Sequence, residues 1–237
     1  MNMKHLFLYL LMGLGMMSKA QTKKPFSYTG SFTLNYEQKK ASSPGAEKGT
    51  VLCAFSGFDA AIIPSFATTM QDVAGAKLLV NTSVNEMTML TTMKKGNKTG
   101  LLTTIPKPVM ESSKNKAPVI TKTGITKTIQ TFSCEKILVS IGDTTKMETW
   151  VTNGIALNVA DALQLTNSGF KSKSPLYGIN MGFLSGTPLE TLISCKNGDT
   201  IKISISDIKK VKPDAAFFNS AGFSIMDARG LPMFNGN

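Results

Sequence analysis

The sequence predicts a mainly β protein with minor α content, in which antiparallel strands supply most of the structure. Three observations support this fold class. Several short runs alternate apolar and polar residues with a period of two, as expected for strands with one buried face. β-branched and aromatic residues dominate these runs. Turn residues separate neighbouring runs at hairpin spacing, most clearly Asn197-Gly198, which suits a type I′ turn.

Residues 1–20 have the pattern of a secretory signal peptide. Lys4 precedes an apolar run over residues 6–17 that is too short to span a bilayer, and Ser18 and Ala20 supply small residues for cleavage. We therefore expect a periplasmic or secreted protein, with no transmembrane segment once the signal peptide is removed.

Removal of this segment would limit the chemistry of the mature chain. The full chain carries a net charge of +11, and residues 1–20 contribute two lysines and no acid, which leaves +9 for the rest. The segment also contains His5, the only histidine. Loss of this residue excludes Ser-His and Cys-His catalysis and the usual histidine-based zinc site. No other catalytic motif withstands scrutiny, so we expect no enzyme activity, no metal site and no cofactor.

Residues 21–230 are expected to form a single β-rich domain, and residues 231–237 a flexible tail. A composition of 42% hydrophobic and 17% charged residues is typical of a folded chain. Residues 107–122 are rich in lysine and proline, which predicts an exposed linker, or alternatively a contact with an anionic envelope surface. Nucleic acid is not an expected partner, because the basic residues lack interleaved aromatic side chains.

The first half of the domain contains several strand patterns. The expected strands are residues 26–37, 51–55, 76–82, 84–93 and 99–105. Residues 38–49 are charged and rich in Ser, Pro and Gly, which predicts a surface loop. Residues 58–73 form an apolar segment interrupted by Pro64, for which we expect an inserted lid or short helices rather than a strand.

Three methionines share one face of the predicted strand 84–93, namely Met87, Met89 and Met93. A methionine stripe of this kind is most often part of a core. The alternative is an apolar lining for ligands, because methionine adapts to varied shapes.

Two strands with a Gly142-Asp143 turn between them form the central predicted hairpin, over residues 134–141 and 145–152. On the second strand, Met147 and Val151 share one face, while Trp150, the only tryptophan, lies on the other.

An amphipathic helix of about three turns is expected over residues 155–165, with Leu157, Val159 and Leu163 on its apolar face. Residues 170–185 are rich in Gly and Ser, and we expect them to form a mobile loop near the mouth of a cavity. A last hairpin is predicted over residues 189–195 and 201–205, and four apolar residues are expected to close the core after it: Phe217, Phe218, Phe223 and Ile225.

The cysteines and two turn threonines leave alternatives open. The three cysteines, Cys53, Cys134 and Cys195, are far apart in the sequence. Two arrangements are therefore open: one disulfide with one free thiol, or three buried free thiols. Thr144 and Thr200 each follow an aspartate at a predicted hairpin tip. These pairs resemble the O-glycosylation acceptor of exported Bacteroidota proteins, although Asp-Thr is also ordinary turn chemistry.

Four segments resemble a bacterial protein family. They are residues 124–136 (GITKTIQTFSCEK), 148–152 (ETWVT), 186–190 (GTPLE) and 208–227 (IKKVKPDAAFFNSAGFSIMD). The chain is similar here to the domain-of-unknown-function family 4412, whose members are exported, mainly Bacteroidota proteins without an assigned activity. The family resembles the outer-membrane lipoprotein carrier fold in outline. This resemblance implies a curved antiparallel sheet, or half-barrel, with one or two helices covering its concave face.

The resemblance also implies a function that the motifs alone do not specify. We expect an exported, non-catalytic envelope protein that binds a lipid, another apolar ligand or a lipidated protein in a groove of the sheet. The predicted lining residues are Met87, Met89, Met93, Trp150, Leu157, Val159 and Leu163.

Two other functions are compatible with the sequence. The first is a structural or adaptor protein with a closed core, whose sheet binds another envelope protein. The second is a hydrolase that uses two converging carboxylates, with Glu135, Glu148 and Glu190 as the nearest acids. An open cavity would favour the carrier, and a filled interior would favour the adaptor.

Overall fold

The computed structural model describes residues 24–65, 72–105, 117–170, 176 and 179–229. The predicted signal peptide and the predicted flexible tail therefore lie outside the described residues. None of the helices in the described part of the chain has the length and apolar character needed to cross a membrane.

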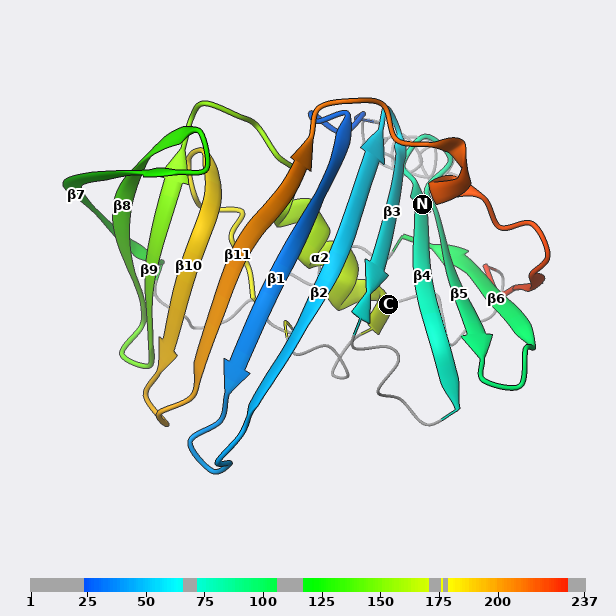
Figure 1. Cartoon of the computed structure of the whole chain (residues 1–237), viewed down its shortest axis with the longest axis horizontal. Helices are drawn as coiled ribbons and strands as arrows, with labels where there is room; N and C mark the ends of the chain where they lie inside the picture. Colours follow the sequence, from blue (N-terminus) through cyan, green and yellow to red (C-terminus); the bar gives the residue numbers. More distant parts are fainter. Residues whose placement is uncertain (1–23, 66–71, 106–116, 171–175, 177–178, 230–237) are drawn as a thin grey trace, which may run out of the picture.

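Twelve strands within the described residues form one sheet (Figure 1). The strands are β1 (Gly30–Lys39), β2 (Ala46–Ser56), β3 (Asp59–Pro64), β4 (Val73–Asn81), β5 (Glu86–Met93), β6 (Lys98–Thr104), β7 (Val119–Ile129), β8 (Phe132–Ile141), β9 (Thr145–Thr152), β10 (Thr187–Cys195), β11 (Thr200–Lys209) and β12 (Ser224–Asp227). All neighbours pair antiparallel except β12 and β6, which are parallel. The mainly β, antiparallel fold class is confirmed.

The order of strands divides the sheet into two regions. Strands β1 to β6 lie in chain order on one side, and β7 to β11 do so on the other, with helix α2 (Val159–Phe170) in the connection between β9 and β10. The two series meet where β1 pairs with β11, and β12 adds to β6 at one edge, while β7 forms the opposite edge. The sheet is open, because the described edge strands β12 and β7 do not pair with each other.

Helix α2 (Val159–Phe170) covers the inner face of the middle of the sheet (Figure 1). The alternating residues of the strands that point towards it are fully buried. They include Phe32, Leu34, Phe55, Ile62 and Leu78, all at most 1% exposed, and Leu163 of α2 is 0% exposed. Apolar side chains therefore fill the space between α2 and the sheet, as in a tightly packed core.

Two buried polar side chains fix the start of α2. The Oδ1 atom of Asn158 accepts a hydrogen bond of 2.9 Å from the backbone N–H of Tyr28, which anchors the helix beside the segment that leads into β1. The hydroxyl of Thr187 accepts from the N–H of Leu157 at 3.0 Å and donates to the carbonyl of Ile155 at 2.6 Å.

These contacts explain why the predicted helix boundary was wrong. Residues 155–158 are not helical, because Thr187 at the start of β10 takes the backbone groups of Ile155 and Leu157. The helix begins after Asn158 and continues to Phe170. Near its end, Gly169 packs closely against Leu78 of β4, because a Cβ added at Gly169 would lie 3.0 Å from the methyl carbons of Leu78. Leu157 is buried, but it precedes the helix instead of belonging to it.

Three other sequence predictions are corrected by the sheet. The segment 58–73 contains strand β3 and the first residue of β4, and its residues 66–71 lie outside the described residues. β3 lacks alternation because α2 contacts its inner side and the short 3-10 helix η3 (Ala215–Phe218) contacts it as well. Strand β2 begins at Ala46, inside the predicted loop 38–49, and β7 begins at Val119, inside the predicted linker 107–122.

The predicted closing aromatic cluster is also wrong. Phe217, Phe218 and Phe223 are only partly buried, and Ile225 on the edge strand β12 is exposed. The remaining strand predictions are confirmed within a few residues at their ends. In particular, β8 and β9 form the central hairpin, with Met147 and Val151 buried on the inner face and Trp150 on the outer face.

Candidate binding sites

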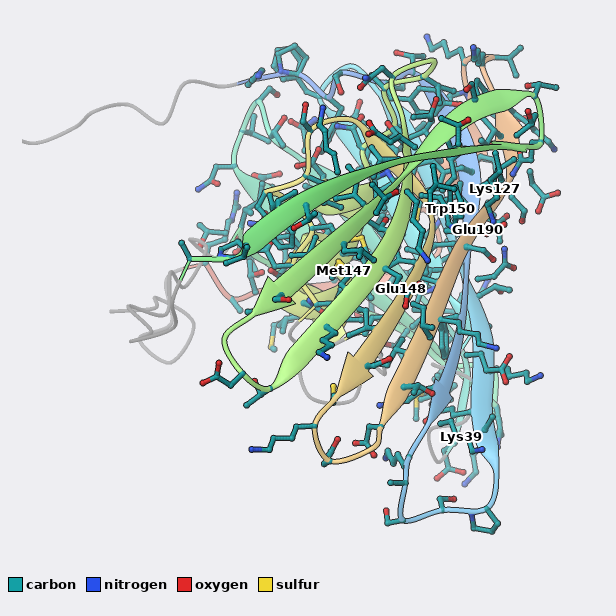
Figure 2. All side chains as sticks on the ribbon, turned by 90° about the vertical axis from the view of Figure 1, so that its left-hand side faces the viewer. Lys39, Lys127, Met147, Glu148, Trp150 and Glu190 are labelled. Carbon is teal, nitrogen blue, oxygen red and sulfur yellow. The ribbon has the colours of Figure 1, made fainter. Side chains whose placement is uncertain are left out.

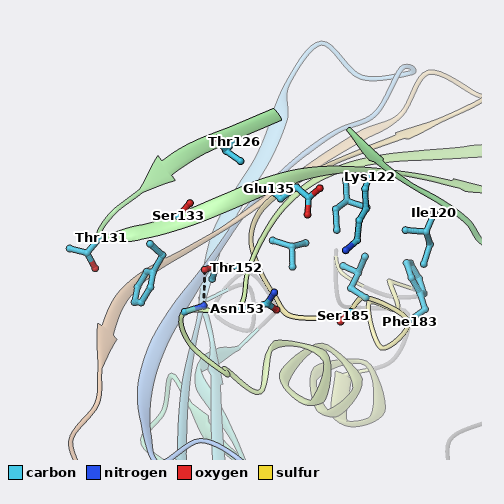
Figure 3. A pocket seen from close by; sticks show the side chains of 15 residues that line it. Ile120, Lys122, Thr126, Thr131, Ser133, Glu135, Thr152, Asn153, Phe183 and Ser185 are labelled. Carbon is cyan, nitrogen blue, oxygen red and sulfur yellow. Dashed lines mark hydrogen bonds between the residues drawn. The ribbon is translucent and has the colours of Figure 1, made fainter. Parts of the chain in front are cut away.

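The inner face of the sheet is hollowed where β7, β8 and β9 leave the shelter of α2 (Figure 3). This feature, called the inner hollow below, has a volume of about 630 Å³. It is lined by Ile120, Lys122, Thr126, Thr131, Phe132, Ser133, Glu135, Ile137, Val151, Thr152, Asn153, Gly154, Phe183, Leu184 and Ser185.

Strand register explains which residues line the inner hollow. Ile120 pairs with Val139 and Lys122 with Ile137, so both β7 residues share the inner face with buried β8 residues. Apolar side chains from three strands thus form a floor, and Phe183 and Leu184 add a wall from the loop before β10. Lys122 and Glu135 also point into this space (Figure 3).

An irregularity in β7 separates its two ends. The register shifts between Lys122 and Thr126, and Gly124 has a φ of 71°, a conformation that favours glycine. The Thr123 hydroxyl donates to the carbonyl of Lys136 at 2.8 Å within the irregular segment. Beyond it, the Lys127 ammonium contacts the Glu190 carboxylate on β10 at 2.5 Å. Lys127 therefore reaches the outer face, while Ile120 and Lys122 remain on the inner face.

A second hollow of about 700 Å³ lies on the outer face, across β2, β1, β11, β10 and β9. It is called the outer groove below. Trp150 lines one end of it, and the Lys127 ammonium lies 4.4 Å from the centre of the indole ring. Lys127, Trp150 and Glu190 lie together on this face in Figure 2.

The three candidate acids do not form one site. Glu135 lines the inner hollow, whereas Glu148 and Glu190 line the outer groove. The Glu148 carboxylate contacts Lys136 at 2.7 Å, and the Glu190 carboxylate contacts Lys127. Glu148 and Glu190 thus have a structural role, because each forms a salt bridge at the surface. No group of three or more histidine, cysteine or acidic side chains in the described part of the chain is arranged to hold a metal ion.

The structure does not bring the seven predicted lining residues into one hollow. Met87, Leu157, Val159 and Leu163 are buried in the core, and Met89 and Met93 pack against it. Trp150 lines the outer groove, on the face opposite to Met147 and Val151. Of the seven, only Trp150 lines either of the two hollows described above.

The cysteines and turn threonines have clear surroundings. All three cysteines are free, Cys53 and Cys134 are buried, and burial raises the pKa of both of these thiols. Thr144 is exposed in the β8–β9 turn, and Thr200 is partly buried at the start of β11. The Asp199 carboxylate before Thr200 accepts from the N–H of Ala41 at 2.8 Å, which gives that aspartate a structural role in the turn.

Sequence reasoning missed Ile120, which lies within the segment predicted as a linker. Phe183 lies within the loop that was predicted near the mouth of a cavity, but it was not named as a lining residue. The run of β-branched residues from Val119 to Thr121 was an available strand signal for Ile120. Phe183 had no comparable signal, because its role depends on a contact between a loop and a distant strand.

Comparisons with known proteins identify a family. The family described as "Domain of unknown function (DUF4412)" matches residues 64–221. Among curated proteins, no significant match is found.

Similar solved structures are distant. A structure of PNGF-II in space group C2 is 12% identical with a TM-score of 0.39, and covers 84% of this chain but 31% of its own. The chain thus spans about a third of the length of PNGF-II. A DUF1329 protein from Desulfovibrio piger is 11% identical with a TM-score of 0.34, over 82% of this chain and 91% of that one.

A domain described as an outer-membrane lipoprotein-sorting protein, from Vibrio parahaemolyticus, is 8% identical with a TM-score of 0.23, over 80% of this chain and 89% of that one. Likeness at this level supports neither a shared ligand nor a shared activity.

Proposed function

The chain belongs to the DUF4412 family, and we propose that it is a non-catalytic binding protein of the bacterial envelope that holds an apolar ligand in the inner hollow. Export through a signal peptide at residues 1–20, to the periplasm or the exterior, is part of this proposal. The ligand is a lipid, an acyl chain or the lipid part of a modified protein.

One observation carries the proposal, namely the apolar surface left uncovered on the inner face at β7 to β9. Ile120 is 44% exposed, although its neighbours on the same face, Val139 and Ile137, are buried. The volume of about 630 Å³ lies within the range of small-ligand pockets. An apolar ligand that covered Ile120 and Phe183 would remove this surface from water, which is the main driving force for such binding.

The polar residues of the inner hollow favour an amphipathic ligand over a pure hydrocarbon. Lys122 and Glu135 accompany the apolar floor, with Ser133 and Ser185 nearby (Figure 3). The Lys122 ammonium supports the polar end of an acyl chain, because charge-assisted hydrogen bonds to a carboxylate or phosphate are strong. Lys122 was predicted as a linker residue, so its position on strand β7 gives it this different role.

A filled interior and an exposed edge strand favour a second candidate, the adaptor. The space beneath α2 is occupied by buried side chains in the described residues. Edge strand β7 exposes Val119 and Ile125, which are 65% and 55% exposed. An exposed strand edge can pair with a strand from another protein. The adaptor would use this edge and leave the inner hollow without a lipid.

Native mass spectrometry of the protein purified from its own cell envelope, followed by organic extraction and lipid analysis, tests the proposal. We expect one apolar molecule per chain, released by the organic solvent. A chain that carries no lipid and copurifies in a fixed ratio with an envelope protein would contradict the proposal and support the adaptor. The intact mass also reports whether Thr144 or Thr200 carries a sugar, since an unmodified mass excludes glycosylation.

A further inference from the structure

The outer groove is a second site, on the face opposite to the inner hollow. The strand register arranges its side chains in two neighbouring rows that run straight across five strands. One row runs from Thr50 on β2 through Asn35, Ser204 and Glu190 to Trp150 on β9. With strands spaced at about 4.8 Å, four spacings make each row about 19 Å long. This length suits a short chain of linked units better than a single small molecule.

The second row has the same direction and contains most of the charges. It runs through Lys48, Glu37, Lys202, Leu192 and Glu148. All of these residues line the groove. The outer groove is therefore a trough lined mainly by hydrogen-bonding side chains, with Leu192 in the second row and an aromatic ring at one end.

The charges of the outer groove are largely balanced by contacts within the protein. The Glu37 carboxylate lies 3.4 Å from the Lys48 ammonium, and the carboxylates of Glu148 and Glu190 contact Lys136 and Lys127. A strongly charged ligand would have to compete with these pairs. A neutral ligand with many hydroxyl groups would instead donate to the same carboxylates without disturbing them.

Trp150 supplies the apolar element that such a ligand needs. Its ring is partly buried and lines the groove. The Lys127 ammonium lies over one face of the ring, 4.4 Å from its centre, so a ligand in the groove would pack against the part of the ring that Lys127 leaves uncovered. Sugar rings present flat C–H faces that pack on an indole, while their hydroxyl groups reach polar side chains around it. Apart from Trp150 and Leu192, the side chains of the two rows are polar, so an acyl chain would gain little here.

We propose that the outer groove binds a neutral oligosaccharide, with one sugar ring packed on Trp150 and further rings hydrogen-bonded along the two rows towards Asn35 and Glu37. This site is independent of the inner hollow. It would let the protein bind a neutral glycan with one face and an apolar ligand with the other.

The single tryptophan makes the test direct, because its fluorescence reports on this site alone. The full chain without residues 1–20 is titrated with the neutral hexasaccharides of maltose, cellobiose, chitobiose and mannose type. We expect a saturable change in fluorescence with at least one of them. Trp150→Phe and Asn35→Ala, both followed by calorimetry, should weaken binding at least about tenfold. The first change reduces the stacking contact, and the second removes the Asn35 Oδ1 acceptor from the groove.

Matched controls separate this site from the rest of the protein. Thr33→Ala alters the same outer face of β1 one row beyond the groove and should bind as the unaltered chain does. Ile120→Glu, in the inner hollow, should also leave oligosaccharide binding unchanged. Polygalacturonate, an anionic polysaccharide, is titrated as the charged control ligand. Three results would overturn the proposal: no hexasaccharide binds at millimolar concentration, the Trp150 and Asn35 variants bind normally, or polygalacturonate alone binds and salt abolishes its binding.

Discussion

The two regions of the sheet differ in what covers their inner faces. Beneath α2, Phe32, Leu34 and Ile62 are at most 1% exposed, whereas Ile120 on β7 is 44% exposed. A helix of 12 residues is about 18 Å long, while twelve strands span about 53 Å at their usual spacing. One helix therefore cannot cover the whole inner face. Helix α2 thus covers the middle of the inner face and leaves Ile120, at one end, exposed.

Truncating one apolar side chain in each region should show this difference most strongly. Leu163→Ala removes a fully buried side chain from α2 and should lower the free energy of unfolding by about 2–5 kcal/mol. Ile120→Ala at the open end should change it by less than about 0.5 kcal/mol, as for other surface positions. Urea denaturation of the ligand-free protein measures both. Equal losses would show that the inner hollow is part of the core.

The attachment of α2 can be broken without touching apolar packing. Thr187→Val keeps the shape of the side chain but removes hydrogen bonds to the backbone of Leu157 and Ile155. Because these groups would remain buried without a partner, we expect a loss of about 1–3 kcal/mol. Thr144→Val, at an exposed turn, is the matched control and should have little effect. If the two variants were equally stable, Thr187 would not anchor the segment before α2.

A smaller effect concerns Tyr36, which lies on the inner face of β1. Burial and the nearby Glu47 carboxylate raise the pKa of its hydroxyl to about 12, from an ordinary value of 10.0. The folded state thus keeps the proton more tightly than the unfolded state does. The resulting stability is complete below pH 10 and is lost as the pH rises towards 12.

Urea denaturation at pH 9 and pH 11 checks this prediction. The free energy of unfolding should fall more between these values for the unaltered chain than for Tyr36→Phe, which has no titrating hydroxyl. Identical decreases would mean that the Tyr36 hydroxyl titrates alike in the folded and unfolded states.

Much of the sheet could be predicted from the sequence, because strands with one covered face alternate visibly. The β8–β9 hairpin is an example, including the opposite faces of Met147 and Trp150. β3 could not be predicted in this way, since it is covered on both sides and reads as a continuous apolar run. The start of α2 depends on Thr187, which is distant in the sequence and leaves no local signal.

The candidate sites were harder to predict than the strands. Whether Ile120 is covered depends on the position of β7 at the edge of the sheet, which strand patterns do not encode. For the methionines of β5, the sequence favoured the core and left a lining role as the alternative, and Met87 is buried in the core. The two rows of the outer groove could not be predicted either, because they depend on the register between β1, near the start of the chain, and β11, near its end.

Two adjacent residues of β7 allow the most direct test of the central claim. Ile120 lines the inner hollow, and Val119 points to the opposite face and is 65% exposed, so both positions should tolerate glutamate without unfolding. The ligand-free protein is titrated with the fluorescent fatty acid cis-parinaric acid. We predict that the unaltered chain and Val119→Glu bind one molecule with equal affinity, while Ile120→Glu binds at least about tenfold more weakly because a charge would be desolvated. Equal binding by both variants, or no binding by the unaltered chain, would contradict the proposed site.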